Sequence, residues 1–402
     1  MVPRSPTSLR LADPDTFADG VPHRELAALR RAEPVTWQPM DAEPGFWAVL
    51  GHAEVQAASQ DPLLFSSTAR GVMLEDPDEA SLAVSRDMLL VMDPPRHGAY
   101  RTQVSPSFKR ATVARLEDQV REVCRGIMAH AREAGPDLEL VHQVSSPLPA
   151  RVIGRMMGLP EADWPMVHDL AERMLAGQDP ELGDAGDQSA MMEMFAYAMA
   201  FAAERRSQPA RGDVTDVLLG SEFDGRTMTD ADVASFFVQL VGAGNDTTKT
   251  LTASGVVALV QHPEQLALVR ADPSLVPGAV EEVLRWANPV HYMRRTATAD
   301  TVLGGVEIAA GDKVALYYTA ANRDEAVFDD PDTFDVRRQP NRHLAFGIAE
   351  HFCLGAHLAR LEARVFFEEL LATFTTIELT GPPVRQRSNL VNGYRSVPVR
   401  LT

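Results

Sequence analysis

The spacing of apolar and polar residues along the chain predicts a mainly α-helical protein with minor β structure. Apolar residues recur every three or four positions over most of the sequence. The helices that this spacing predicts are 22–31, 53–60, 110–133, 138–157, 161–175, 189–206, 229–262, 273–287 and 353–374. Strand-like runs are few and short, at 46–50, 292–295 and 302–308. We expect a long loop with at most a short helix at 66–90 and an exposed break at 176–186.

The predicted helix 229–262 is apolar on most of its faces and should therefore lie in the interior. Thr229 followed by Asp232 is typical of a capping box, which fixes the start of a helix. Two glycines in the middle, in the triplet 242–244, lower helix stability by roughly 1 kcal/mol each relative to alanine. Small residues at this place leave room against the helix face, either for a ligand or for a closely packed neighbouring helix.

The length of 402 residues corresponds to roughly two or three domains at the usual domain size. No Gly/Ser-rich or Pro-rich linker, repeat or low-complexity tract divides the chain, however. We therefore expect a single domain spanning residues 1–402, and we expect it to be a monomer.

The formal net charge of −18 argues against nucleic acid as the main partner. The N-terminal stretch MVPRSPTSLRLADPDTF lacks the apolar core of a signal peptide, and no later run approaches the roughly 18 apolar residues of a membrane span. We therefore expect a cytoplasmic protein without membrane insertion. In a reducing compartment, Cys124 and Cys353 are not expected to form a structural disulfide.

Cys353 lies in the stretch AFGIAEHFCLGAHLARLE, residues 345–362, where glycines let a loop bend ahead of a predicted helix. If the helix begins at Cys353, its N-terminus stabilises a thiolate, and Phe352 and Leu354 are expected to shield it from water. One cysteine cannot hold zinc or an iron–sulphur cluster, which take about four protein ligands, whereas haem needs only one thiolate. A buried core thiol is nevertheless the commoner role of a lone cysteine.

The surrounding pattern F-G-x-x-x-H-x-C-x-G decides between these roles. It is formed by Phe346, Gly347, His351, Cys353 and Gly355. Five fixed positions match by chance in about one chain in ten thousand at ordinary residue frequencies. Through this pattern the sequence resembles the cytochrome P450 family of haem-thiolate monooxygenases. The resemblance implies the cytochrome P450 fold, in which the long central helix and the C-terminal helix sandwich haem b. It also implies that Phe346, His351, Cys353 and Gly355 contact the haem and that Cys353 binds its iron.

A second motif, LVGAGNDTT, lies in the middle of the long predicted helix, at residues 240–248. Thr247 can donate a hydrogen bond to the carbonyl four residues earlier and so bend the helix. The adjacent Asp246 provides an acid for moving protons. The alternative is tight helix–helix packing with Asp246 exposed. The resemblance implies that Asp246 and Thr247 are catalytic residues that help to activate oxygen, and that Ala243 and Gly244 line the haem.

A third motif is EEVLRW, in which Glu282 and Arg285 are three residues apart and can pair on one helix face. An exposed pair of this kind is worth about 0.3–0.5 kcal/mol. The resemblance implies instead that the pair is buried and completed by a later arginine, which we assign to Arg338. We interpret the three residues as serving the fold and haem incorporation rather than the reaction.

The carboxylates of a buried haem need several cations or hydrogen-bond donors. His97 and Arg101 are four residues apart, so one helix face can present both. The resemblance implies that these two residues, Arg295 and His351 bind the haem propionates. Arg294 is the alternative to its neighbour Arg295.

The resemblance also implies O2 as co-substrate and electrons from NAD(P)H, delivered by a ferredoxin and a ferredoxin reductase. A basic patch could attract an acidic ferredoxin, although scattered surface arginines are an equal alternative. The cations considered for this patch are Arg101, Lys109, Arg110, Arg115, Arg360 and Arg364.

By family position, the substrate pocket is expected to be lined by apolar side chains, namely Met88, Leu240, Val290, Met293 and Val391. Such a pocket favours hydroxylation or epoxidation of a lipophilic small molecule such as a terpenoid, a steroid or a branched lipid. One alternative is a tailoring oxidase acting on a macrolide- or polyketide-type metabolite. Another, from a different class, is a non-catalytic haem protein that binds a ligand; the acid–alcohol pair Asp246 and Thr247 counts against it, because a sensor needs no proton relay.

Overall fold

The computed structural model describes residues 9–41, 43–175, 179, 188–223 and 225–402. Most of these residues are helical and the strands are short, so the prediction of a mainly α protein with minor β structure is confirmed. The chain forms two compact units. One contains the residues up to Gly98 together with 281–353 and 387–392, and the other contains 99–280, 354–386 and 393–402. The single domain inferred from the sequence stays a prediction.

The first unit is built on a five-stranded sheet with the order β1-β2-β10-β7-β3. Its strands are β1 (Val35–Gln38), β2 (Phe46–Val49), β10 (Lys313–Tyr317), β7 (Tyr292–Ala297) and β3 (Phe65–Ser66). Only β2 and β10 run parallel; the other neighbours are antiparallel. The prediction of strands at 46–50 and 292–295 is confirmed, and the region 302–308 forms the hairpin β8 (Thr301–Leu303) and β9 (Val306–Ile308).

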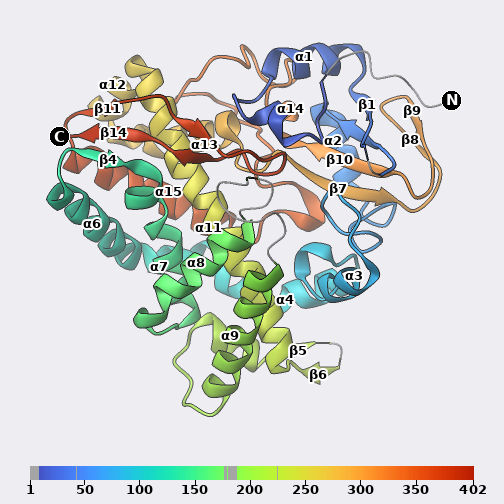
Figure 1. The fold of residues 1–402 in the computed structure, drawn as a ribbon, viewed down its shortest axis with the longest axis horizontal. Helices are drawn as coiled ribbons and strands as arrows, with labels where there is room; N and C mark the ends of the chain where they lie inside the picture. The colour runs from blue at the N-terminus through green and yellow to red at the C-terminus, as the bar shows by residue number, and fades with distance from the viewer. Residues whose placement is uncertain (1–8, 42, 176–178, 180–187, 224) are drawn as a thin grey trace. The chain divides into compact units, whose positions relative to one another are not determined.

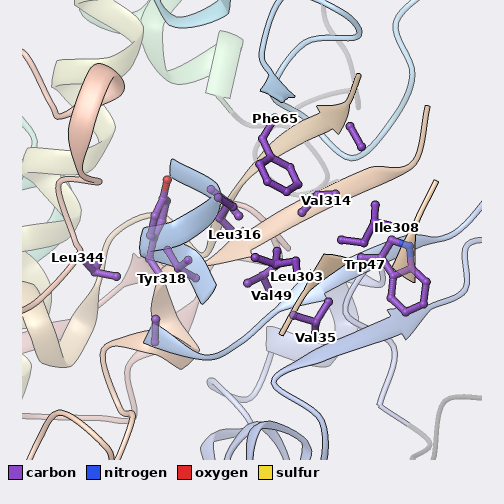
Figure 2. Packing of buried hydrophobic residues seen from close by; sticks show 14 residues of the cluster. Val35, Trp47, Val49, Phe65, Leu303, Ile308, Val314, Leu316, Tyr318 and Leu344 are labelled. Atoms are coloured by element: carbon purple, nitrogen blue, oxygen red, sulfur yellow. The ribbon is translucent and has the colours of Figure 1, made fainter. Parts of the chain in front are cut away.

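Strand β10 is buried on both of its faces. Val314 and Leu316 pack with Val49 in one apolar cluster (Figure 2). Ala315 and Tyr317 belong to a second cluster, because successive side chains of a strand point to opposite faces of the sheet. After Lys313, the sequence of this strand is therefore apolar throughout, without the alternation of apolar and polar residues seen in a half-buried strand.

Short helices accompany this sheet. They are α1 (His23–Ala32), α2 (His52–Gln60), α3 (Glu79–Ser85) and α14 (Tyr318–Ala321). The loop predicted at 66–90 contains α3 as its one α-helix, as expected. Helices α4 (Arg96–Phe108) and α13 (Val276–Ala287) each begin in one unit and end in the other.

The second unit is helical around α11 (Asp230–Gln261), the long helix that the apolar pattern predicts. The other helices of this unit include α5 (Arg110–Val113), α6 (Glu117–Ala134), α7 (Pro147–Met157), α8 (Trp164–Leu175), α9 (Gln188–Arg206), α10 (Val214–Leu219), α12 (Pro263–Ala271) and α15 (Ala356–Thr373). Helices α7, α8, α9 and α15 pack against α11, and Figure 1 shows α8 and α9 beside it. Its small sheet has the order β11-β14-β4, from Ile377–Leu379, Pro398–Leu401 and Asp137–Glu139, and β5/β6 and β12/β13 form separate two-stranded pairs.

The start of α11 has the capping box that the sequence predicts. The Asp232 backbone N–H donates to Thr229 Oγ1 at 3.3 Å, and the Thr229 N–H donates to Asp232 Oδ2 at 2.7 Å. These two reciprocal bonds satisfy N–H groups that have no partner within the helix, so they fix where it begins.

Two predicted helices are wrong in part. The segment 110–133 is divided into α5, a 3-10 turn at Ala114–Leu116, and α6. The segment 138–157 begins with strand β4 and a π-helix at Val141–Ser145 before α7. Strand β4 pairs with β14, more than 250 residues later, and this tertiary pairing overrides the local helical pattern. Most of the break predicted at 176–186 lies outside the described residues.

Among the helices of the described residues, none combines the length and the apolar character needed to cross a membrane.

Candidate active site

The loop that carries Cys353 is held in a tight turn. The Cys353 N–H donates to the Phe346 carbonyl at 2.8 Å, and the Gly347 N–H donates to the Leu344 carbonyl at 2.9 Å. Gly347 has a φ of +65°, a conformation that a residue with a side chain adopts only with strain. The backbone conformation therefore requires glycine at position 347, the second residue of the motif.

The helix after this loop begins later than predicted. Helix α15 starts at Ala356 with Gly355 as its N-cap, so Cys353 precedes the helix instead of opening it. Leu354 and Gly355 form a turn, and this turn delays the first helical residue. Phe352 is 38% exposed and packs edge-on against Phe346. The shielding of the thiol by Phe352 and Leu354 stays a prediction.

The two cysteines lie in different environments. Cys124 on α6 is completely buried, and this burial raises the pKa of its thiol well above the ordinary range. Cys353 is only partly buried. Because only a thiolate is a strong metal ligand, Cys353 is the better candidate of the two.

His97 and His351 lie together in the first unit. Their ring centroids are 4.6 Å apart. His97 is buried, with Nδ1 2.7 Å from Glu350 Oε1, and His351 Nε2 is 3.3 Å from Ser67 Oγ. The structure thus brings two of the predicted propionate ligands into contact. Arg101, the third, follows His97 by one turn of α4 and is half-buried.

The structure distinguishes between the adjacent Arg294 and Arg295, which the sequence cannot separate. Arg294 Nη1 forms an ion pair with Asp76 Oδ1 at 2.7 Å. Arg295 is 4% exposed, and its guanidinium donates to the carbonyl of Arg294 at 2.7 Å. No carboxylate among the described residues lies within ion-pair distance of Arg295, and burial lowers the pKa of this guanidinium. A buried cation without a counter-ion is costly, so the site fits an anionic group such as a haem propionate.

In the middle of α11, Thr247 Oγ1 donates to the Ala243 carbonyl at 2.7 Å, which is the back-bond that the sequence predicts. Ala243 is exposed although most of the helix is buried. Gly244 has a different environment, because a Cβ at this position would lie 2.8 Å from Ile153 Cδ1 on α7. Helix packing therefore accounts for Gly244, and the open helix face lies at Ala243.

Asp246 is buried, so the alternative with an exposed Asp246 is wrong. Its carboxylate pairs with Lys249, one turn later, and Lys249 Nζ also lies 2.7 Å from Glu172 Oε1 on α8. The sequence analysis missed both partners. The spacing of Asp246 and Lys249 could have indicated the first pair, but no local pattern points to Glu172.

Glu282, Arg285 and Arg338 come together as the third motif predicts. Glu282 and Arg285 side chains are fully buried, with Arg285 Nη2 2.7 Å and Nε 2.8 Å from the two carboxylate oxygens. Arg338 Nε lies 3.2 Å from Glu282 Oε1. Asn341 Nδ2 and the Asp335 N–H also donate to this carboxylate, both at 3.0 Å, and neither was anticipated. Every oxygen of the buried acid is thus satisfied.

The five predicted pocket residues are distributed over both units. Val290 and Val391 form an isolated β-bridge, and Met88 and Met293 in the same unit are half-buried, as is Leu240 on α11. Their contact with a substrate stays a prediction.

The basic patch for a ferredoxin stays a prediction, and one of the cations considered for it is already paired. Arg364 forms ion pairs with Glu117 at 2.6 Å and with Glu368 at 2.9 Å, so its charge is already balanced. Lys109 and Arg110 are exposed at the end of α4 and on α5.

The comparisons with known proteins agree on one family. A family model described as Cytochrome P450 matches residues 184–396. A methyl-branched lipid omega-hydroxylase of Mycobacterium tuberculosis is 40% identical over 393 residues, covering 95% of this chain and 91% of the relative. A steroid C26-monooxygenase of Mycolicibacterium smegmatis is 33% identical and covers 100% of this chain and 95% of its own.

A solved structure gives the same result. The Mycobacterium marinum cytochrome P450 in complex with pseudoionone has a TM-score of 0.92 and 37% identity, with both chains covered completely. The family model spans more than half of the chain, and these relatives match it over nearly their whole lengths. The protein therefore belongs to the cytochrome P450 family and is a P450 monooxygenase.

Proposed function

We propose that the protein hydroxylates or epoxidises a lipophilic small molecule, with a terpenoid, a steroid or a methyl-branched lipid as the substrate class. Relatives whose names specify a methyl-branched lipid and a steroid cover almost the whole chain, and a similar structure holds pseudoionone. The reaction uses O2 and two electrons. We propose haem b as the cofactor that supplies the oxygen-activating chemistry when it is bound.

The observation that carries this proposal is the buried guanidinium of Arg295, which has no carboxylate partner among the described residues. Together with the contacting imidazoles of His97 and His351, it provides donors for the carboxylates of a haem. Cys353 would bind the iron as a thiolate, on the loop that Gly347 bends. These residues fit the group that the family requires.

The residues of α11 have two further roles in the proposal. Ala243 is exposed and carries only a methyl group, so it leaves room against this face of the helix. Thr247 and the buried Asp246 form the acid–alcohol pair that would move protons during oxygen activation.

The names of the two relatives share a position of attack. An omega-hydroxylase acts at the end of a chain, and carbon 26 is at the end of a steroid side chain. We therefore expect a terminal methyl group on a branched chain to be the first position to examine. Action on a macrolide- or polyketide-type metabolite is the alternative outcome of the same substrate screen.

We propose further that NAD(P)H supplies the electrons through a ferredoxin and a ferredoxin reductase, and that the protein works in the cytoplasm as a monomer. The exposed cations Lys109, Arg110 and Arg115 remain available to an acidic partner.

The absorption spectrum of the purified protein, reduced and then exposed to carbon monoxide, tests the proposal. A strongly red-shifted Soret band is expected from thiolate-bound haem, and it would be followed by screening steroids, terpenoids and branched lipids for spin-state shifts. A globin-like band would exclude thiolate ligation, and the absence of haem would overturn the proposal.

Replacing Thr247 by alanine is expected to uncouple electron consumption from product formation. The hydroxyl that bonds to the Ala243 carbonyl is lost, and with it the alcohol of the proton relay. NADH consumption should continue while product yield falls roughly a hundredfold, the lower end of the range that proton-transfer groups contribute. Thr252, which bonds back to the carbonyls of Thr248 and Lys249 on the same helix, is the matched control. Unchanged coupling in Thr247→Ala would rule out the relay role.

Replacing Arg295 by methionine is expected to weaken haem retention without destabilising the apoprotein, because the buried cation has no protein carboxylate to lose. Arg294→Met is the matched control. It breaks the ion pair with Asp76 and should lower the free energy of unfolding of the apoprotein. Haem titration and urea denaturation of the two variants measure these effects, and equal haem loss in both would remove the special role of Arg295.

A further inference from the structure

A buried chain of charges leads away from Asp246. The side chains of Asp246, Lys249 and Glu172 are 4%, 9% and 24% exposed, so the chain becomes steadily more accessible towards α8. One ammonium group thus lies between two carboxylates. Burial alone would disfavour the charge on Lys249, but the two carboxylates outweigh it and raise the pKa of the ammonium well above its ordinary value.

The α8 end of this chain continues into further polar groups. Ser146 Oγ lies 3.2 Å from Glu172 Oε1 and 3.2 Å from His168 Nε2. Burial opposes ionisation of Glu172, but Lys249 outweighs burial and lowers the pKa of Glu172. Burial also lowers the pKa of His168, which keeps the imidazole neutral at neutral pH.

Three polar groups near this chain have no hydrogen-bond partner among the described residues. They are Asp246 Oδ2, His168 Nδ1 and the side-chain amide of Asn245. His168 and Asn245 line a small cavity between α7, α8 and α11, with about 10 Å³ open to the centre of a water molecule. That volume is close to the minimum for one water, but apart from His168 and Asn245 the lining is apolar, and Asp246 does not line the cavity. The unpaired Oδ2 of Asp246 is therefore buried beside its ion pair with Lys249 and not at this cavity.

We infer that Lys249 and Glu172 are positioning residues for oxygen activation, through which Asp246 is oriented and linked to solvent. Lys249 occupies Oδ1 of Asp246 and so leaves Oδ2 as the oxygen that exchanges protons. Glu172 holds the ammonium from the other side and provides the solvent-facing end of the network. Each proton that Oδ2 releases is replaced by one from solvent, and no redox step is involved. This inference rests on the proposed function, because it concerns the reaction in which Asp246 acts.

Replacing Lys249 and replacing Glu172 should have opposite effects on Asp246. Removing the charge of Lys249 takes a cation away from Asp246 and makes its ionised form less favourable. Removing the charge of Glu172 makes Asp246 the remaining carboxylate paired with the Lys249 ammonium, and the ionised form of Asp246 becomes more favourable. The other titratable groups facing this region are His168 and Asp169 on α8 and His142 on the π-helix. On α15, Glu362 faces Thr248. None of these groups changes in the two variants.

The test compares Lys249→Met and Glu172→Gln, two substitutions that keep side-chain size. The measurement is the fraction of NADH that yields product, as a function of pH. We expect the pH at which this fraction changes, the pH limb of coupling, to be higher than in the wild type in Lys249→Met and lower in Glu172→Gln, each by about one pH unit. Lys249→Arg keeps the charge and should restore most of the wild-type profile. If Lys249→Met does not fold, the downward shift in Glu172→Gln and the rescue by Lys249→Arg still decide the question.

A second readout needs no turnover. The lowered pKa of Glu172 means that its stabilising effect is present at neutral pH and is lost as pH falls through the folded-state pKa. The difference in unfolding free energy between wild type and Lys249→Met should therefore shrink on acidification. Lys313 is the matched control for the coupling measurement, because it is likewise buried against two carboxylates, Glu43 and Asp76, and touches no proposed site residue. Lys313→Met should leave the pH dependence of coupling unchanged.

The outcomes separate the inference from the proposed function. Suppose that the wild type shows the red-shifted Soret band. If the pH limbs of the two variants then do not shift, or shift in the same direction, the inference is overturned and the proposed function stands. A shift in Lys313→Met equal to that in Lys249→Met would also overturn it, since any buried lysine would then act alike. Absence of the red-shifted band in the wild type would overturn both.

Discussion

Replacing Cys353 by histidine should give a protein that still binds some haem but forms no oxygenated product. Imidazole is a good iron ligand, yet as a neutral group it lacks the electron donation by which a thiolate favours cleavage of the O–O bond. The reduced protein with carbon monoxide should then show a globin-like Soret band instead of the strongly red-shifted one. Full product formation by Cys353→His would exclude ligation through the thiolate.

The second cysteine provides the control for this experiment. Cys124 is completely buried on α6, and its thiol stays protonated because burial raises its pKa. Cys124→Ala should keep the red-shifted band and the product yield while losing a small amount of stability from the cavity it leaves. A loss of the band in Cys124→Ala would mean that the spectrum reports folding in general and not ligation by Cys353.

Replacing Glu282 by glutamine should lower the free energy of unfolding by about 3–5 kcal/mol. The carboxylate is fully buried and accepts hydrogen bonds from Arg285 and Arg338, so the substitution leaves two guanidinium groups without their anion. Because the whole free energy of unfolding of a protein is about 5–15 kcal/mol, such a loss is a large fraction of it. Urea denaturation followed by circular dichroism measures the change.

An exposed glutamate tests whether burial is the cause. Glu117 also pairs with two arginines, Arg121 and Arg364, but its side chain is 38% exposed. Glu117→Gln should cost about 1 kcal/mol or less, since solvent screens such pairs. If the two substitutions cost the same, the Glu282 cluster does not stabilise the fold in the way its geometry indicates.

Features with a short-range signature could be predicted from the sequence. The capping box of α11 depends on residues 229 and 232, and the hydrogen bond of the Thr247 hydroxyl goes to a carbonyl four residues earlier. The turn around Gly347 likewise follows from a local pattern of residues. In each case the atoms that bond are close together along the chain, so the pattern alone contains the information.

Contacts between distant segments could not be predicted in this way. Lys249 and Glu172 are 77 residues apart in sequence, and neither has a neighbour that indicates the other. The strand β4 was mistaken for a helix because its partner, β14, lies near the C-terminus. Arg294 and Arg295 are adjacent on strand β7, where successive side chains point to opposite faces, so only the structure shows which guanidinium meets a carboxylate.

The two glycines of α11 that face neighbouring helices limit how this enzyme can be redesigned. A Cβ at Gly244 would lie 2.8 Å from Ile153, and one at Gly255 would lie 2.4 Å from Phe367 on α15. Eleven residues are close to three full turns, so both glycines mark the same side of the helix. Mutant libraries that seek new substrates should keep both positions fixed and vary Ala243, whose side chain is exposed. A side chain at either glycine would require Ile153 or Phe367 to shift, which disturbs the packing of α11 against α7 or α15.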